Sequence, residues 1–260
     1  MSSFVKIDFG ALPNTTINII ISLKEGENMK KIFAFDLDGT LAELGKAIPD
    51  NIIRKLQKIE KAGHIVVICS GKPTYYLCGM MRQVGLNEPV LIGENGATIQ
   101  FGVDLPPLRR YKANYDTSAE DALRKLRQYI EKEAGFDVWF QPNEVCLTPF
   151  YHTPDEEEAL EKVFSKHRDL IENHLDCFKH CDSFDLTPKG VNKMSGLSRL
   201  SGILSIPAER FIAVGDGKND YPMFEYAGVS VGIKISEDSI VDVNFDTVDN
   251  ALSYILEIIL

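Results

Sequence analysis

Residues 33–44 of the 260-residue chain read FAFDLDGTLAEL, an apolar and aromatic run that ends in two carboxylates and a glycine. In a β-strand the side chains at positions i and i+2 lie on one face, so Asp36 and Asp38 approach the same ligand where the strand ends. Two carboxylates this close repel each other unless a cation lies between them. The stretch therefore predicts a buried strand that leads directly into a cation site.

Further apolar runs alternate with amphipathic stretches, an order typical of βα units around a mostly parallel sheet. Between the first two runs, residues 49–63 place Ile52, Leu56 and Ile59 on one side of a predicted helix that starts at Pro49. We therefore expect an α/β fold with a doubly wound, Rossmann-like parallel sheet. Its predicted strands, buried on both faces, are residues 31–38, 64–70, 89–95, 210–216 and 229–233.

A middle region, residues 101–185, has a different pattern of apolar and polar residues. Two helical patterns, at 117–135 and 153–167, alternate with more polar strand-like stretches. This order is typical of a small antiparallel sheet with helices on one face. We predict an inserted α+β cap domain over 101–185 and a core domain formed by residues 29–100 and 186–260.

Composition limits the partners and the compartment. The formal net charge of −10 gives no overall field that attracts nucleic acid or an anionic membrane. No apolar run approaches the length of a membrane span, and five irregularly spaced cysteines suggest a reducing cytoplasm. For residues 1–28, an N-terminal extension before Met29, two interpretations stay open: a misassigned start, or an arm that packs poorly. The sequence does not indicate the oligomeric state.

Other polar groups are predicted at the same edge of the sheet as the two aspartates. Asp216 ends a predicted strand in VGDGKND, with Asn219 and Asp220 in the turn behind it. Three acids at strand ends make a Mg²⁺ site credible, because this ion prefers carboxylates, water and phosphate oxygens. Donors for a phosphate come from Ser70 and Gly71 in ICSGKP, and from Lys193 near a helix start in PKGVNKMSGL.

Taken in order, DLDGT, SGK, the lysine of GVNKMSGL and GDGKND resemble the haloacid dehalogenase superfamily of phosphohydrolases. The cap position, between the second motif and the lysine, is similar to the Cof-like, sucrose-phosphatase, mannosyl-3-phosphoglycerate phosphatase and phosphoglycolate phosphatase branches. GENGA at 93–97 and DLTPKGVNK at 185–193 strengthen the resemblance.

The resemblance implies a role for each matching residue. Asp36 is implied as nucleophile and Mg²⁺ ligand, and Asp38 as general acid and base with its backbone carbonyl on the metal. Asp216 is implied as a further metal ligand, and Asp220 and Asn219 as groups that orient the site. Ser70 and Lys193 are implied as ligands of the phosphoryl oxygens. We expect Gly71 and Asn219 at the substrate or phosphate as well.

The expected activity is Mg²⁺-dependent hydrolysis of a small phosphorylated metabolite, a sugar phosphate or a phosphorylated acid, through an aspartyl-phosphate. A second aspartate is needed most when the leaving group is a poor one such as a sugar alcohol. Two alternatives remain: a phosphomutase of the phosphomannomutase type, and a non-catalytic binding protein. Candidate cap contacts to the substrate are Arg109, Arg110, Trp139, Gln141 and His152.

Overall fold

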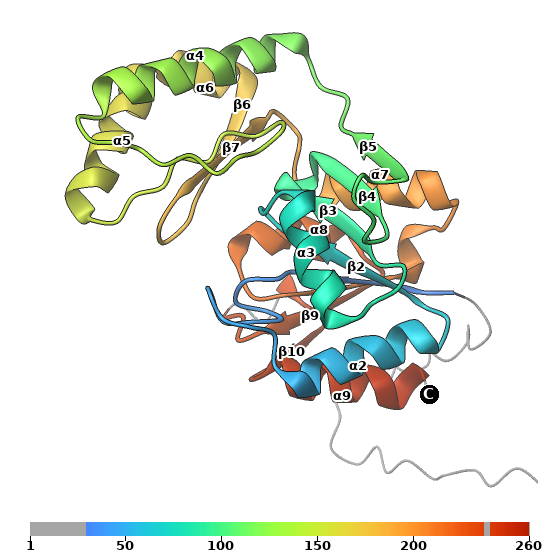
Figure 1. Cartoon of the computed structure of the whole chain (residues 1–260). Helices are drawn as coiled ribbons and strands as arrows, with labels where there is room; N and C mark the ends of the chain where they lie inside the picture. Colours follow the sequence, from blue (N-terminus) through green and yellow to red (C-terminus); the bar gives the residue numbers. More distant parts are fainter. Residues whose placement is uncertain (1–29, 237–239, 260) are drawn as a thin grey trace, which may run out of the picture.

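The computed structural model of the chain describes residues 30–236 and 240–259. Its main sheet has eight strands in the order β10-β9-β8-β1-β2-β3-β4-β5 (Figure 1). The first six strands of that order run parallel, and β4 and β5 join antiparallel at one edge. The strands are β1 (Ile32–Phe35), β2 (Ile65–Cys69), β3 (Val90–Gly93), β4 (Thr98–Phe101), β5 (Arg109–Lys112), β8 (Phe211–Gly215), β9 (Val229–Ile233) and β10 (Val243–Phe245).

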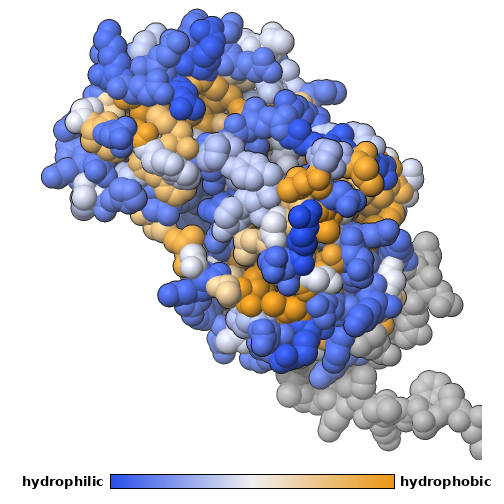
Figure 2. Space-filling model, viewed as in Figure 1, coloured by the Kyte–Doolittle hydropathy of each residue, from blue (hydrophilic) through white to orange (hydrophobic). Residues whose placement is uncertain are grey.

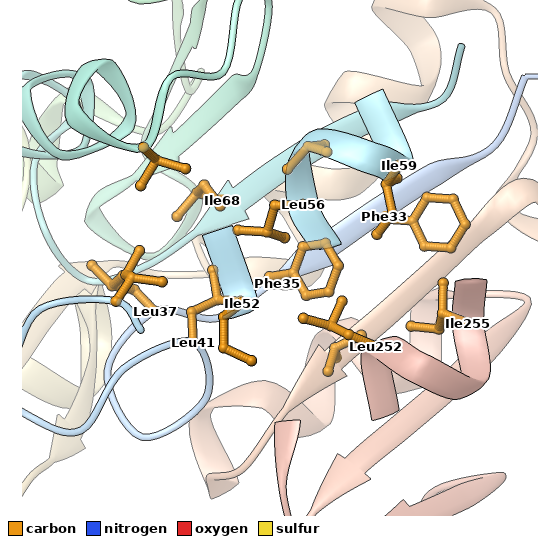
Figure 3. Close-up of a cluster of buried hydrophobic side chains, with 14 of the residues drawn as sticks. Phe33, Phe35, Leu37, Leu41, Ile52, Leu56, Ile59, Ile68, Leu252 and Ile255 are labelled. Carbon is orange, nitrogen blue, oxygen red and sulfur yellow. The ribbon is translucent and has the colours of Figure 1, made fainter. Parts of the chain in front are cut away.

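Helices cover both faces of this sheet. Alternation along β1 sends Phe33 and Phe35 to one face, where they join buried side chains of α2 (Asp50–Lys61), α3 (Thr74–Val84) and α9 (Val248–Ile259) (Figure 3). Ile32 and Ala34 face the opposite layer, formed by α7 (Lys193–Leu204) and α8 (Tyr221–Tyr226). Strand β1 is therefore buried on both sides, and the predicted doubly wound α/β fold is confirmed.

A second lobe is inserted between β5 and α7 (Figure 1). It has its own apolar core, in which Leu126, Leu160 and Phe184 are buried together, whereas most of the surface in view is hydrophilic (Figure 2). Asp116 caps the N-terminus of helix α4, because its side chain accepts the Ser118 N–H at 2.8 Å. Its elements are α4 (Thr117–Glu133), α5 (Pro154–Lys166), α6 (Arg168–His174), β6 (Leu175–Lys179) and β7 (Phe184–Pro188).

Two predictions about the middle region differ from the structure. Strand β5 belongs to the main sheet, although its residues fall in the stretch assigned to the cap; its wholly exposed sequence RRYK gives no apolar signal for an edge strand. The strands expected within 136–150 form only isolated bridges, among them Phe140 with Pro149. Pro142 and Pro149 lack the N–H that a ladder needs, so a regular strand does not form there.

The prediction about residues 1–28 lies outside the described residues. In the described part of the chain, no helix combines the length and the apolar character that crossing a membrane requires. Three short 3₁₀ turns complete the described elements: η1 (Glu94–Gly96), η2 (Ala208–Arg210) and η3 (Lys218–Asp220).

Candidate active site

The structure brings the predicted strand-end residues to one edge of the sheet. Asp36 directly follows β1, Ser70 follows β2 and Asp216 follows β8. Because β1 lies between β2 and β8, these three ends meet where the strand order reverses, which is where ligands bind in open α/β sheets. Lys193 opens α7 and Asp220 closes η3 behind them.

Lys193 lies between two of the acids. Its side chain is fully buried, and its Nζ is 2.5 Å from Asp36 Oδ1 and 2.5 Å from Asp220 Oδ1. Burial alone lowers the pKa of Lys193, but the charges of Asp220 and Asp36 outweigh it and raise the pKa. The lysine is therefore a fixed cation. A capping box between Asn192 and Ser195 sets the start of the helix that carries it.

The acids outnumber this cation. Asp36, Asp216 and Asp220 each present a carboxylate oxygen, and these atoms lie within 4.8 Å of one another. Burial raises the pKa of Asp36 to about 7 although Lys193 opposes it, and burial also raises the pKa of Asp216 against the hydrogen bond from Thr40. A divalent cation would relieve this excess of negative charge, and hard oxygen ligands suit Mg²⁺.

Asp220 also braces the loop that carries Asp216. Its Oδ2 accepts the backbone N–H groups of Asp216 at 2.9 Å and Gly217 at 3.0 Å. Oδ1 holds Lys193, so both oxygens of Asp220 already have protein donors. This geometry suits the supporting role predicted for Asp220 better than direct metal ligation.

A glycine permits the loop after β1 to close on Asp216. Gly39 has φ +94°, a left-handed conformation, and a Cβ built there would lie 2.2 Å from Asp216 Oδ2. Beside it, the Oγ1 of Thr40 donates to Asp216 Oδ1 at 2.5 Å. Any side chain at position 39 would therefore displace the carboxylate. On the same loop, Asp38 is half-buried, 3.4 Å from Lys72 Nζ.

The loop after β2 makes contact with the cap. Ser70 N–H donates to Ile92 in the core, whereas the Gly71 carbonyl accepts a 3.0 Å hydrogen bond from Gln141 Nε2 in the inserted lobe. Ser70 Oγ accepts the N–H of Lys72 at 3.2 Å. Gln141 therefore connects the cap to the predicted phosphate-binding loop.

A cavity of about 620 Å³ opens between the sheet edge and the cap. Lys193 and Asp220 do not line it; both are fully buried, and Lys193 contacts the lining residue Asp36. Of the five candidate cap contacts, only Gln141 lines this cavity. Arg110 pairs with Glu144 instead, and Trp139 is exposed and packs edge-on against the Phe150 ring. The predicted residues that line it are Asp36, Asp38, Ser70, Gly71, Asp216 and Asn219.

The haloacid dehalogenase-like hydrolase family matches residues 33–144 and 109–250, which include both the sheet edge and the cap. The chain belongs to this family. The predicted superfamily and hydrolase class are confirmed.

Similar proteins include named phosphatases. The 5-amino-6-(5-phospho-D-ribitylamino)uracil phosphatase of Bacillus subtilis is 26% identical to the hydrolase over 251 residues, covering 82% of this chain and 90% of its own. The phosphoglycolate phosphatase of Methanosarcina acetivorans is 27% identical over 216 residues, with 81% and 86% covered.

Solved structures share the fold. A haloacid dehalogenase-like hydrolase from Bacteroides thetaiotaomicron has a TM-score of 0.73 at 19% identity, covering 87% of this chain and all of that one. The C-terminal domain of a trehalose-6-phosphate phosphatase from C. albicans has a TM-score of 0.70 at 20% identity, with 95% and 97% covered.

Sequence reasoning missed a buried acid where the cap of the hydrolase meets its core. The Asp185 carboxylate accepts hydrogen bonds from Asn95 at 2.6 Å and Thr148 at 2.7 Å, and its Oδ2 lies 3.1 Å from His180 Nε2. Burial raises the pKa of Asp185, but the bond and charge of His180, helped by the Thr148 and Asn95 bonds, outweigh it and lower the pKa. An acid inside the apolar strand stretch SFDLTP is the one signal that marks this position.

A second residue that the sequence did not indicate is Glu94, which directly precedes Asn95 in the chain. It also connects the core to the cap. Its carboxylate accepts the N–H groups of Glu144, Val145 and Cys146 at 2.8 to 3.0 Å. The backbone of Glu94 and Asn95 is left-handed, with φ of +53° and +52°. This conformation is costly for residues other than glycine, so the junction itself must hold it in place.

Proposed function

We propose that the hydrolase is a Mg²⁺-dependent phosphatase that releases phosphate from a small phosphorylated metabolite through an aspartyl-phosphate. The observation that carries the proposal is the buried contact of Lys193 with Asp36 at the edge of the cavity. A lysine that stays protonated beside a carboxylate neutralises negative charge as the carboxylate approaches an anionic phosphoryl group. The free cysteines fit our proposal of a cytoplasmic location.

In the first step, the Asp36 carboxylate attacks phosphorus and the bond from phosphorus to the ester oxygen breaks. Lys193 contacts only Oδ1 of Asp36, which leaves the second oxygen for the attack. Asp38, half-buried at the cavity wall, gives its proton to the departing alkoxide. The product of this step is an alcohol, and phosphate remains on Asp36.

In the second step, Asp38 takes a proton from water, whose oxygen attacks phosphorus and releases inorganic phosphate from Asp36. Ser70 and the Gly71 backbone, which line the cavity, would hold the phosphoryl oxygens. Asp36, Asp216 and the Asp38 carbonyl would hold Mg²⁺, which when bound neutralises charge on the phosphoryl group.

Phosphate release from p-nitrophenyl phosphate, measured with Mg²⁺ and after removal of divalent ions by a chelator, tests this proposal. We expect turnover only with the metal, and a loss of about 10⁴-fold or more in Asp36→Asn. The matched control is Asp121→Asn, the same substitution on the exposed surface of α4, which should keep full activity.

Turnover that persists in Asp36→Asn would overturn the assignment of the nucleophile. Transfer of phosphate between two positions of a sugar without net release would indicate a mutase. Absence of release from every substrate tested would favour a binding protein.

A further inference from the structure

The cap side of the cavity is built mainly by the β6–β7 hairpin, where residues 177–183 line it. Two aromatic rings, Phe150 and Phe178, contribute apolar surface there, and Gln141, Thr148 and Ser183 contribute hydrogen-bonding groups. The volume of about 620 Å³ lies within the roughly 300–1,000 Å³ typical of small-molecule sites, so it has room for a group larger than phosphate.

Both basic side chains of the hairpin already have acidic partners. Lys179 pairs with Glu157 and with Glu161, the latter at 2.8 Å. His180 pairs with the buried Asp185 at 3.1 Å. These two basic side chains therefore offer little uncompensated positive charge to a ligand.

Asp182 adds a negative charge to the same hairpin. Its Oδ1 accepts a hydrogen bond from Ser183 Oγ at 3.0 Å, and it forms no salt bridge with the described residues. The negative charge of Asp182 is near enough to raise the pKa of His180, although the Asp185 hydrogen bond is the larger cause. The cap side thus presents a carboxylate without a matching free cation.

The remaining lining cations lie on the core side. Lys72 is 3.4 Å from Asp38, and Lys218 lies in the turn between Asp216 and Asn219, beside the predicted phosphoryl site. Within residues 30–236 and 240–259, no arginine lines the cavity. A second anionic group on a substrate would therefore lack the forked donor that suits carboxylates and phosphates.

We propose that Asp182, together with the His180–Asp185 pair, makes the cap select an uncharged polyhydroxylated leaving group and reject an anionic one. A hydroxyl can donate to the Asp182 carboxylate, whereas a carboxylate at that position faces Asp182 as a like charge. This inference rests on the proposed phosphatase function and names its substrate class: phosphorylated sugars and polyols, rather than phosphorylated acids.

Sorbitol 6-phosphate and 6-phosphogluconate form a matched pair for the test. Both are linear six-carbon phosphomonoesters, and they differ in a terminal hydroxymethyl group against a carboxylate. We expect kcat/KM for phosphate release to favour sorbitol 6-phosphate by about tenfold or more, as a like-charge contact predicts. Equal or better turnover of 6-phosphogluconate would overturn the inference.

Two variants assign the preference to Asp182. Asp182→Asn should raise kcat/KM for 6-phosphogluconate relative to sorbitol 6-phosphate, because the amide removes the like charge and still bonds hydroxyls. Asp121→Asn on the exposed surface of α4 removes the same charge far from the cavity lining and should leave the ratio unchanged. An unchanged ratio in Asp182→Asn would also overturn the inference.

Competition against p-nitrophenyl phosphate separates this inference from the proposed function. If p-nitrophenyl phosphate is hydrolysed with Mg²⁺, the inhibition constants of the two sugar compounds report the preference even when both turn over slowly. Tighter inhibition by sorbitol 6-phosphate supports the inference, and inhibition by neither compound contradicts it. No Mg²⁺-dependent hydrolysis of p-nitrophenyl phosphate contradicts the phosphatase function itself.

Discussion

The sheet edge and the cap hairpin both place carboxylates beside basic groups, but the balance of charge differs. At the sheet edge, Lys193 is shared by Asp36 and Asp220, and Asp216 adds a further acid. At the hairpin, each basic side chain has an acidic partner of its own. The surplus of acid at the edge fits the proposed metal and phosphoryl group. The hairpin leaves Asp182 without an ion pair among the described residues, which fits the proposed neutral leaving group.

The largest effect should come from removing the cation at the sheet edge. Lys193→Met leaves Asp36 and Asp220 buried without their shared partner, so we expect phosphate release to fall by about 10³-fold or more and the free energy of unfolding by about 3–5 kcal/mol. Phosphate release and urea unfolding measure the two effects.

Lys72→Met is the matched control, because Lys72 also faces an aspartate but is a quarter exposed. Its ion pair with Asp38 should contribute about 0–1 kcal/mol to stability. Equal destabilisation by the two substitutions would contradict the difference that burial makes between the lysines.

The second prediction concerns the junction between core and cap. Asp185→Asn keeps the shape of the side chain but replaces one carboxylate oxygen, which accepts from Asn95 or Thr148, with an NH₂ donor. It also removes the negative charge that faces His180. We expect a loss of about 2–3 kcal/mol in the free energy of unfolding, since a buried donor is left unpaired. Urea unfolding measures this loss.

Asp182→Asn on the same hairpin should change the free energy of unfolding by no more than about 0.5 kcal/mol. The Asp182 side chain is only partly buried, and Asn can still accept from Ser183. A loss as large as that of Asp185→Asn would contradict this prediction. It would mean that any negative charge on the hairpin stabilises the cap, and not specifically the hydrogen bonds of Asp185.

The sequence located the residues of the sheet edge because strand ends fix them locally. Asp36, Ser70 and Asp216 each follow an apolar run, and parallel strands carry such positions to one edge. The contact between Asn95 of the core and Asp185 of the cap has no comparable signal in the sequence. Asn95 and Asp185 are 90 residues apart, and their contact depends on how the cap sits on the core.

The limits of the cap prediction have a similar cause. The helices of the cap repeat their apolar residues with helical spacing, so α4 and α5 were predicted close to their observed bounds. The segment between α4 and α5 has strand-like residues but takes backbone partners from distant positions, such as Leu147 with Leu186. Short-range alternation cannot distinguish such a bridged segment from a regular strand.

The third prediction tests the Glu94 contact. Glu94→Gln replaces one oxygen by an amide, so the N–H groups of residues 144–146 lose an acceptor. We expect a loss of about 1–2 kcal/mol in the free energy of unfolding, with faster hydrogen exchange at Val145 and Cys146. Glu144→Gln, which removes the partly exposed ion pairs of Glu144 with Arg110 and Lys112, should leave exchange at Val145 and Cys146 slow.

The smallest effect is a pH dependence at the hairpin. The hydrogen bond and the charge of Asp185 raise the pKa of His180 above its ordinary 6.5, against the effect of burial. A raised pKa means that the folded state binds the proton more tightly. The pair therefore stabilises the fold fully below pH 6.5 and loses this contribution as pH rises through the raised pKa.

His180→Gln isolates this contribution, because glutamine can still donate to Asp185 but carries no titrating charge. The difference in the free energy of unfolding between wild type and His180→Gln should be larger below pH 6.5 than at mildly alkaline pH. His152→Gln, at an exposed cap position, should show no such change. A His180→Gln difference that stays constant with pH would show that the imidazole acts only as a neutral donor, and the hairpin would then carry more net negative charge than its ion pairs indicate.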